Sequence, residues 1–238
     1  MARTKTTSNP PPNVYYRALY PWASAELLAE TSTLNSSEDV RKHREGEPDC
    51  KGRVFGRESD AYVSVHPCAK GEPVCADDQA NDGELFFFLY SIVFKRIKLH
   101  LPLTGFERAL LTEISVAPAQ LHPNSWDFMR AFTILCNHFG HPPPPSIDVF
   151  LHFSEAKSPG KNLWVSFSGV AGRVLLTLFQ QFYKDFKENF FKVCCTEHDP
   201  TLLDGFLLYW VRELKLKKPK TLEELTLSIT KCARFSQV

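Results

Sequence analysis

The sequence predicts an α+β fold, with one mixed domain of helices and strands and a largely irregular N-terminal region. Residues 126–139 carry apolar side chains at steps of three and four, which is the repeat of a helix that buries one face. Residues 162–168 instead alternate polar and apolar side chains, which is the repeat of a half-buried strand. Because 43% of the 238 residues are hydrophobic and 19 are Phe, the chain can build a substantial core around such elements.

Residues 1–84 are expected to form a poorly ordered polar region with one short helix. Residues 1–12 are small and polar and end in three prolines, a composition typical of disordered chain. Pro21 is placed to open the short helix, because proline fits the first helical position. Residues 38–60 hold seven acidic and six basic side chains with few apolar ones, which favours a solvated, irregular segment. The weak alternation at 62–65 predicts one short strand.

The compact domain is expected to span residues 85–233. Its opening run, Leu85 to Phe94, is too short to cross a membrane and is followed by basic residues, which favours a buried strand or helix. Apolar side chains at helical spacing predict a helix over 106–115. The helix with the apolar stripe can be capped by Asn124 or Ser125.

The second half of this domain is predicted to mix short helices and strands. Ser146 can cap a short helix. Residues 174–179 fit a strand that returns along the preceding one, and their pattern also fits a helix that continues to Lys187. Residues 190–195 are predicted to form a further strand, and a Thr-x-x-Glu capping box at Thr221 predicts a last helix.

The net charge and the cysteine content indicate which partners and which cellular compartment to expect. The 28 Lys and Arg residues nearly balance 27 Asp and Glu, so the net charge of +1 gives no support to a dedicated nucleic-acid binder. Seven Cys, in a chain whose first residues lack the apolar stretch of a signal peptide, indicate reduced thiols. We therefore expect an intracellular protein of the nucleus or cytoplasm, neither secreted nor membrane-bound.

Two groups of basic residues lie beside aromatic ones and could bind nucleic acid by phosphate contact and base stacking. The first follows the aromatic residues of 86–90, and the second lies beside Tyr209 and Trp210. We favour the alternative that the rings belong to the core and the cations keep the surface soluble. The candidate nucleic-acid contacts are Lys95, Arg96, Lys98, His100, Arg212, Lys215, Lys217, Lys218 and Lys220.

No stretch of the sequence has the spacing of a known reactive centre. Cys136, His138 and His141 lie close together, but a zinc site needs about four ligands, usually as two spaced pairs. Cys136 also falls on the apolar stripe, where a free thiol behaves as a small hydrophobic side chain. The sequence lacks a Gly-x-x-x-x-Gly-Lys phosphate loop and a Gly-x-Ser-x-Gly nucleophile motif. We therefore expect no catalytic residue, no metal or other cofactor, and no small-molecule substrate.

Residues 101–126 contain a Leu-Pro-Leu opening, an Ala-Pro-x-Gln-Leu segment and an Asn shortly before a Trp, and a predicted helix then runs on to Cys136. These motifs resemble the plant gypsy-type transposon domain family, and the resemblance extends over residues 97–211. It implies an origin in a retroelement and brings no catalytic residues to carry over. The motif residues suit structural roles, since Gln can bond exposed backbone groups and Trp can anchor a helix on the core. They are Pro118, Gln120, Leu121, Asn124 and Trp126.

Taken with this resemblance, the sequence predicts a non-enzymatic, retroelement-derived structural or interaction protein. Such a protein would be of capsid-like type and would act by self-association or by binding a partner. The alternative is a nuclear nucleic-acid-binding module that uses the two basic groups.

Overall fold

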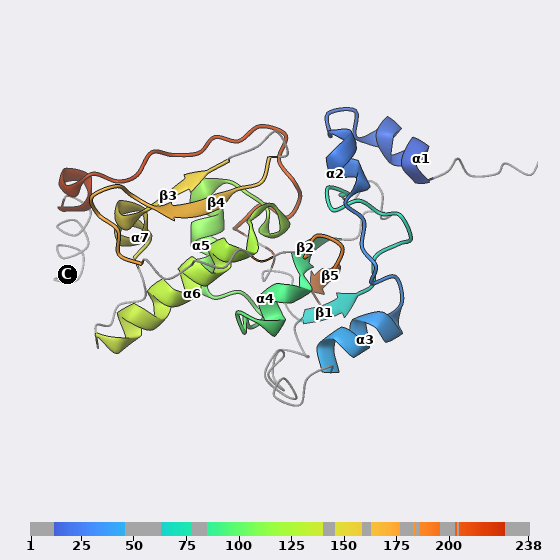
Figure 1. Cartoon of the computed structure of the whole chain (residues 1–238), viewed down its shortest axis with the longest axis horizontal. Coiled ribbons are helices and arrows are strands. Elements are labelled where there is room, and N and C mark those ends of the chain that lie inside the picture. Colours follow the sequence, from blue (N-terminus) through green and yellow to red (C-terminus); the bar gives the residue numbers. More distant parts are fainter. Residues whose placement is uncertain are drawn as a thin grey trace, which may run out of the picture.

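The structure is a computed structural model that describes residues 12–45, 63–77, 85–139, 146–158, 163–176, 183, 186–195, 203 and 205–226. Its helices and two antiparallel sheets confirm the predicted α+β fold (Figure 1). Within this part of the chain, no helix is long and apolar enough to cross a membrane.

The three-stranded sheet joins segments that are far apart in the sequence. Strand β5 (Phe190–Cys195) lies between β1 (Val63–His66) and β2 (Phe86–Tyr90) and runs antiparallel to both. The strands predicted at 62–65 and 190–195 therefore both form. Because β1 precedes residue 84 and β5 follows it, the expected domain boundary at that residue does not separate two structural units.

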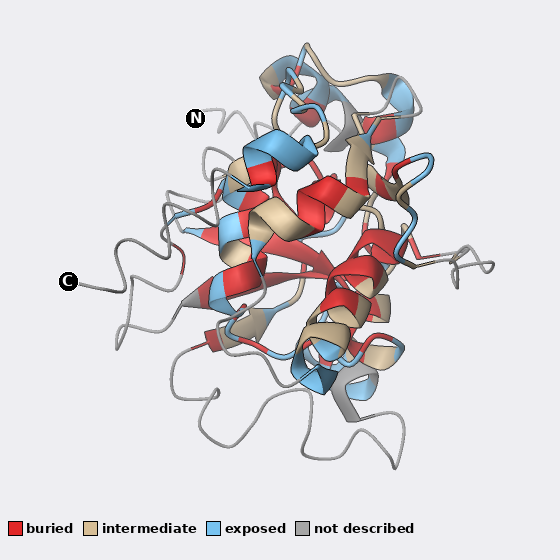
Figure 2. Ribbon diagram, turned by 90° about the vertical axis from the view of Figure 1, so that its left-hand side faces the viewer, coloured by how far each residue is buried: buried red, intermediate tan, exposed pale blue. Residues whose placement is uncertain are grey.

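The two faces of this sheet bury different cores, and Figure 2 shows buried residues gathered at the centre of the fold. Successive residues of a strand point to opposite faces. Phe87 and Leu89 of β2 join the larger core, whereas Phe86, Phe88 and Tyr90 join a second, aromatic core. All five residues of β2 are buried because both faces are covered, which explains why its sequence is apolar without alternation.

The first two helices are α1 (Pro12–Leu19) and α2 (Ala25–Ala29). The helix expected to open at Pro21 begins instead at Ala25. Ser24 caps it, because its Oγ accepts a hydrogen bond from the Leu27 N–H at 3.1 Å. Pro21 lies in the turn between the two helices. A side-chain cap, rather than proline, sets the start of α2.

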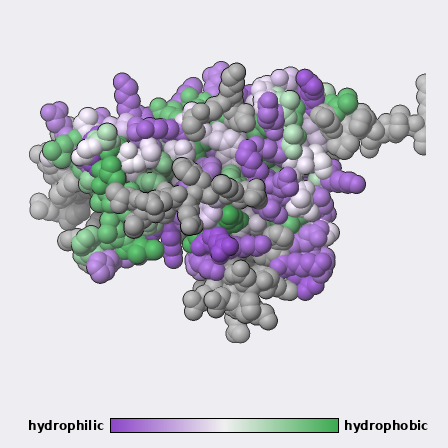
Figure 3. All heavy atoms as spheres, viewed as in Figure 1, coloured by the Kyte–Doolittle hydropathy of each residue, from purple (hydrophilic) through white to green (hydrophobic). Residues whose placement is uncertain are grey.

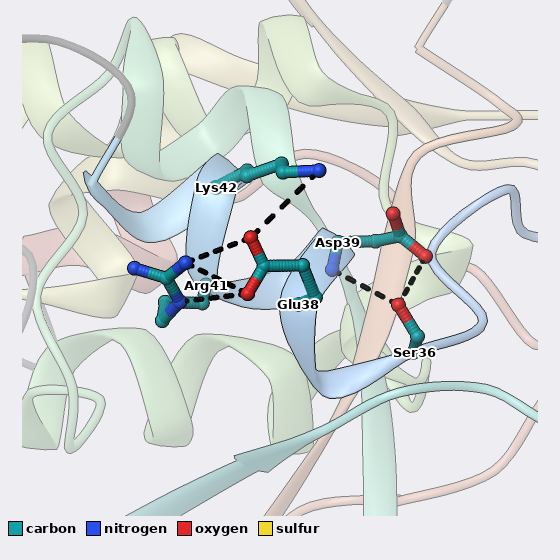
Figure 4. Close-up of polar contacts among 5 residues, drawn as sticks. All are labelled: Ser36, Glu38, Asp39, Arg41 and Lys42. Carbon is teal, nitrogen blue, oxygen red and sulfur yellow. Dashed lines mark hydrogen bonds and ion pairs between the residues drawn. The ribbon is translucent and has the colours of Figure 1, made fainter.

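Helix α3 (Ser37–Glu45) occupies the start of the segment that was expected to be irregular. Ser36 precedes it, and its Oγ accepts from the Asp39 N–H at 3.1 Å (Figure 4). Glu38 forms an ion pair with Arg41 at 2.7 Å and a longer one with Lys42 at 3.8 Å. These pairs stand three and four residues apart, where charged side chains stabilise a helix, and Val40 is buried beneath them. The expectation of irregular structure is wrong up to Glu45, and residues 46–60 lie outside the described residues.

The helices predicted at 106–115 and after Ser146 are both present. The strand predicted from Leu163 begins only at Ser166, because Val165 bridges to Leu121 instead. Residues 174–176 form neither strand nor helix, and 177–179 lie outside the described residues. The remaining elements are α4 (Ser91–Lys95), α5 (Gly105–Ile114), η4 (Pro118–Gln120), α6 (Pro123–His138), α7 (Ile147–Phe153), β3 (Ser154–Lys157) and β4 (Ser166–Gly169).

A buried ion pair ties β5 to the loop after β1. Lys192 Nζ lies 3.0 Å from Glu72 Oε1, and both side chains are almost fully buried. The Lys192 ammonium also lies 4.9 Å from the centre of the Phe86 ring. Glu72 Oε2 accepts from the Ala69 N–H at 2.7 Å, so the carboxylate also closes its own loop.

Replacing one partner of this pair should destabilise the protein more than replacing both. Lys192→Met leaves the Glu72 carboxylate buried without its cation and should lower the free energy of unfolding by roughly 3–5 kcal/mol. The double variant Glu72→Gln/Lys192→Met should recover most of that loss. Urea unfolding of the two variants checks this. Equal losses in the single and double variants would show that the pair is not the source.

Candidate functional site

The motif block, residues 117–126, connects α5 to α6 through the interior of the fold. Pro118 begins η4, which packs against β2. Leu121 bridges to Val165, whose N–H donates to the Gln120 carbonyl at 2.9 Å. Every residue of the block is buried except His122, which is partly exposed. A buried connection must find partners for its polar groups within the protein, and the block does so with its own side chains.

Gln120 bonds both backbone groups of one distant residue. Its Oε1 accepts from the Val211 N–H at 3.1 Å, and its Nε2 donates to the Val211 carbonyl at 3.1 Å. Oε1 also accepts a long bond from the Ala117 N–H at 3.5 Å. This is the backbone bonding expected of a Gln in this motif, but nothing in the sequence pointed to Val211 as the partner.

The polar residues at the start of α6 do not cap it in the expected way. His122 is the cap, and its Nδ1 accepts from the Asn124 N–H at 3.2 Å. Asn124 and Ser125, the predicted caps, bond to other segments: Asn124 Oδ1 accepts from the Tyr183 N–H at 3.3 Å, and Ser125 Oγ accepts from the Phe167 N–H at 2.9 Å. These bonds hold β4 and the segment at residue 183 against α6.

Trp126 is among the largest fully buried side chains of the described residues. It lies in the larger core, one residue after Ser125. The motif block thus places an aromatic anchor and three hydrogen-bonding side chains in the interior, and its side chains are engaged in packing and backbone bonding.

The second basic group lies on a C-terminal strap, which we define as residues 205–226. It crosses the top of Figure 1 in orange and red, above β3 and β4. Gln120 holds it at Val211, and its Lys220 N–H donates to the Leu151 carbonyl at 3.1 Å. Near its end the predicted capping box forms, since Thr221 Oγ1 accepts from the Glu224 N–H at 3.2 Å and Glu224 Oε2 accepts from the Thr221 N–H at 2.7 Å.

Three cations of the strap contact the protein itself. Lys217 pairs with Glu113 at 2.7 Å, and Lys220 pairs with Asp148 at 3.5 Å. The Arg212 guanidinium lies 5.5 Å from the centre of the Trp22 ring. Lys215 and Lys218 are exposed. Of the neighbouring rings, Trp210 is buried and Tyr209 packs against Phe86, so both rings contribute to the aromatic core.

The first basic group lies elsewhere. Lys95 ends α4, and Arg96, Lys98 and His100 are exposed just after it. In Figure 1 α4 lies beside the three-stranded sheet, whereas the strap runs across the top, so the two groups belong to separate parts of the fold. The aromatic residues before α4 are those of β2, which are buried. Nucleic-acid binding by these cations stays a prediction.

Cys136, considered above as a metal ligand, and two further thiols, Cys68 and Cys75, are wholly or partly buried. Burial raises the pKa of the Cys68 thiol far above its usual range and that of Cys75 to about 12. Cys136 is half-buried against the larger core, and burial raises its pKa too. His141 lies outside the described residues. Among the residues that are described, no three His, Cys, Asp or Glu side chains gather in a way that could hold a metal ion.

Comparison with known families finds a match for the segment that contains the motif block. Residues 87–158 match the family model described as "Putative gypsy type transposon". This segment is similar to that family, and we refer to it below as the transposon domain. It extends from β2 to the end of β3 and so begins before the resemblance seen in the sequence and ends well short of Val211. No curated protein and no solved structure matches the chain.

One cluster beside the transposon domain was missed in the sequence. Glu30, the C-cap of α2, forms a short ion pair with Lys187, and the Lys187 ammonium lies 5.2 Å from the centre of the Trp164 ring. Tyr90 and Phe186 pack around the same Trp. Glu30 lies more than a hundred residues before Trp164 and Lys187 in the sequence. The only local signal was an acidic residue directly after an apolar helix.

Removing the Gln120 side chain should detach the strap at Val211 while the rest of the fold stays intact. Gln120→Ala leaves the N–H and carbonyl of Val211 without their partner, which costs roughly 1–3 kcal/mol per buried unpaired group. We expect the Val211 amide to lose hydrogen-exchange protection while the β5 amides keep theirs. Thr112→Val, which removes the bonds of Thr112 Oγ1 to the Gly205 and Arg108 carbonyls and leaves Gln120 in place, is the control. Unchanged protection of Val211 in the Gln120 variant would contradict the assigned role.

His122 should make the protein less stable in mild acid. Burial, with a smaller effect of Lys187, lowers its pKa from 6.5 to about 4. Between these pH values the unfolded chain binds more protons, so the contribution is complete above pH 6.5 and is lost as the pH falls towards 4. His122→Asn keeps an oxygen that can cap α6 and does not titrate. The stability advantage of the wild type over this variant should fall by on the order of 2 kcal/mol between pH 7 and 4.5, after allowance for the partly exposed ring. Urea unfolding at both pH values measures it, and a constant difference would count against the assignment.

Proposed function

We propose that the chain is a non-enzymatic structural protein derived from a gypsy-type element, and that its copies associate through the end of α6. The observation that carries this proposal is the exposure of large apolar side chains there. Ile134 is 55% exposed and Phe139 is 66% exposed, and both lie within the transposon domain. Figure 3 shows hydrophobic surface at the lower left, over this end of α6.

The chemistry of the motif block supports a structural role. Gln120, Asn124 and Ser125 each bond backbone groups of a distant segment, and His122 caps a helix. Side chains used in this way hold the fold together and present no reactive group to a substrate. The buried thiols, whose pKa values lie above the usual range, are poor nucleophiles for the same reason.

A second copy of the chain is the partner that this surface fits best. A contact between two equivalent helix ends is closed by a twofold axis, so one pair of apolar residues supplies both sides of the interface. The net charge of +1 also leaves little electrostatic repulsion between copies. Burial of Ile134 and Phe139 on both copies would remove exposed apolar surface that water disfavours.

Placing charge at this end of α6 should prevent association. Ile134→Glu/Phe139→Glu should remain monomeric at concentrations where the wild type forms larger species, because burying the new carboxylates is costly. The matched control is Val14→Glu/Leu222→Glu, which puts the same charge at side chains that are 57% and 66% exposed elsewhere on the molecule. Sedimentation velocity over a range of concentrations compares the three proteins.

The control should associate as the wild type does. A wild type that stays monomeric at the highest concentration would overturn the proposal, and equal loss of association in the control would show that any added charge, rather than this surface, is responsible.

A further inference from the structure

We propose that Glu30 and Trp164 form an ammonium-binding site, which Lys187 fills in this structure and which can accept a lysine side chain from another molecule when Lys187 leaves. The site lies outside the transposon domain and away from the end of α6. Nothing in the proposed self-association requires it.

The buried carboxylate of Glu30 pairs with a cation through only one of its two oxygens. Its side chain is 9% exposed, and Oε1 pairs with Lys187. Oε2 is buried and has no hydrogen-bond partner among the described residues. Burial raises the pKa of the Glu30 carboxyl, and Lys187 and, to a smaller extent, the Trp164 indole N–H offset part of this rise. A buried carboxylate is stable only with a counter-ion, so the site favours a bound cation over none.

The ring of Trp164 supplies the other half of the site. The face of an indole attracts a cation, and the Lys187 ammonium lies 5.2 Å from its centre. Tyr90, Phe186 and Trp210 fix this ring, with centre-to-centre distances of 5.5, 5.5 and 5.2 Å. Tyr90 belongs to β2 and is fully buried, so the wall of the site is anchored on the sheet.

The two partners differ in how firmly they are held. The side chain of Lys187 is 45% exposed, whereas that of Glu30 is 9% exposed. Lys187 can therefore turn into solvent while the carboxylate and the rings stay in place, and the carboxylate left unpaired then favours the binding of another cation. The vacated site offers a carboxylate and an aromatic face at the spacing of a primary alkylammonium, which is the chemistry of a lysine side chain.

Chemical rescue tests the site. Lys187→Ala removes the atoms from Cγ to Nζ, which propylammonium reproduces. The variant should melt at a lower temperature than the wild type, and propylammonium chloride should raise its melting temperature with a saturable dependence on concentration. Sodium chloride at equal ionic strength and neutral propanol should not. N-acetyl-lysine amide, added in place of propylammonium, should stabilise the variant in the same way.

Three further proteins make the result decisive. Lys187→Met keeps an uncharged side chain in the site and should not respond to propylammonium, whereas the wild type should respond only at concentrations high enough to displace Lys187. Glu30→Gln/Lys187→Ala lacks the carboxylate and should not respond either. The proposal fails if Lys187→Ala responds no more than Lys187→Met, or if removal of the carboxylate leaves its response intact.

Discussion

The pairing of β5 on both edges is the constraint on which the rest of the fold depends. Each N–H and carbonyl of a buried strand needs a partner, and β5 finds them in β1 on one side and β2 on the other. That arrangement fixes the faces of the sheet, since Phe87 must then enter the larger core and Phe86 the aromatic core. The buried Glu72–Lys192 pair can exist only because β5 carries Lys192 into the covered side of the sheet.

Elements that show a repeat of apolar residues or a capping motif could be predicted from the sequence, and their contacts with distant segments could not. Helix α6 shows its buried face as a repeat of apolar residues, and a capping box marked Thr221. Helix α3 escaped prediction because ion pairs and a serine cap stabilise it, and of its residues 37–42, whose burial the structure describes, Val40 is the buried one. The strand expected from Leu163 starts later because Val165 is taken by Leu121, a contact that no local pattern encodes.

The same distinction applies to the candidate site. The type of bond made by Gln120 follows from its amide group, but Val211 lies 91 residues along the chain. Asn124 and Ser125 are good capping residues in isolation, and the fold uses them to bond Tyr183 and Phe167 because His122 already caps the helix. Glu30, Trp164 and Lys187 come from three separate segments, so only the folded chain shows that a carboxylate, an indole and an ammonium meet.

The transposon domain does not coincide with a complete folding unit of the structure. Residues 87–158 include β2 but neither β5 nor the strap. As an isolated fragment, this stretch would expose the unpaired edge of an all-apolar strand to water. The amide of Gln120 would lose its partner, Val211. Such a fragment would be prone to aggregate. The matched segment is thus an incomplete folding unit, and the sequence on either side of it is a necessary part of the same fold.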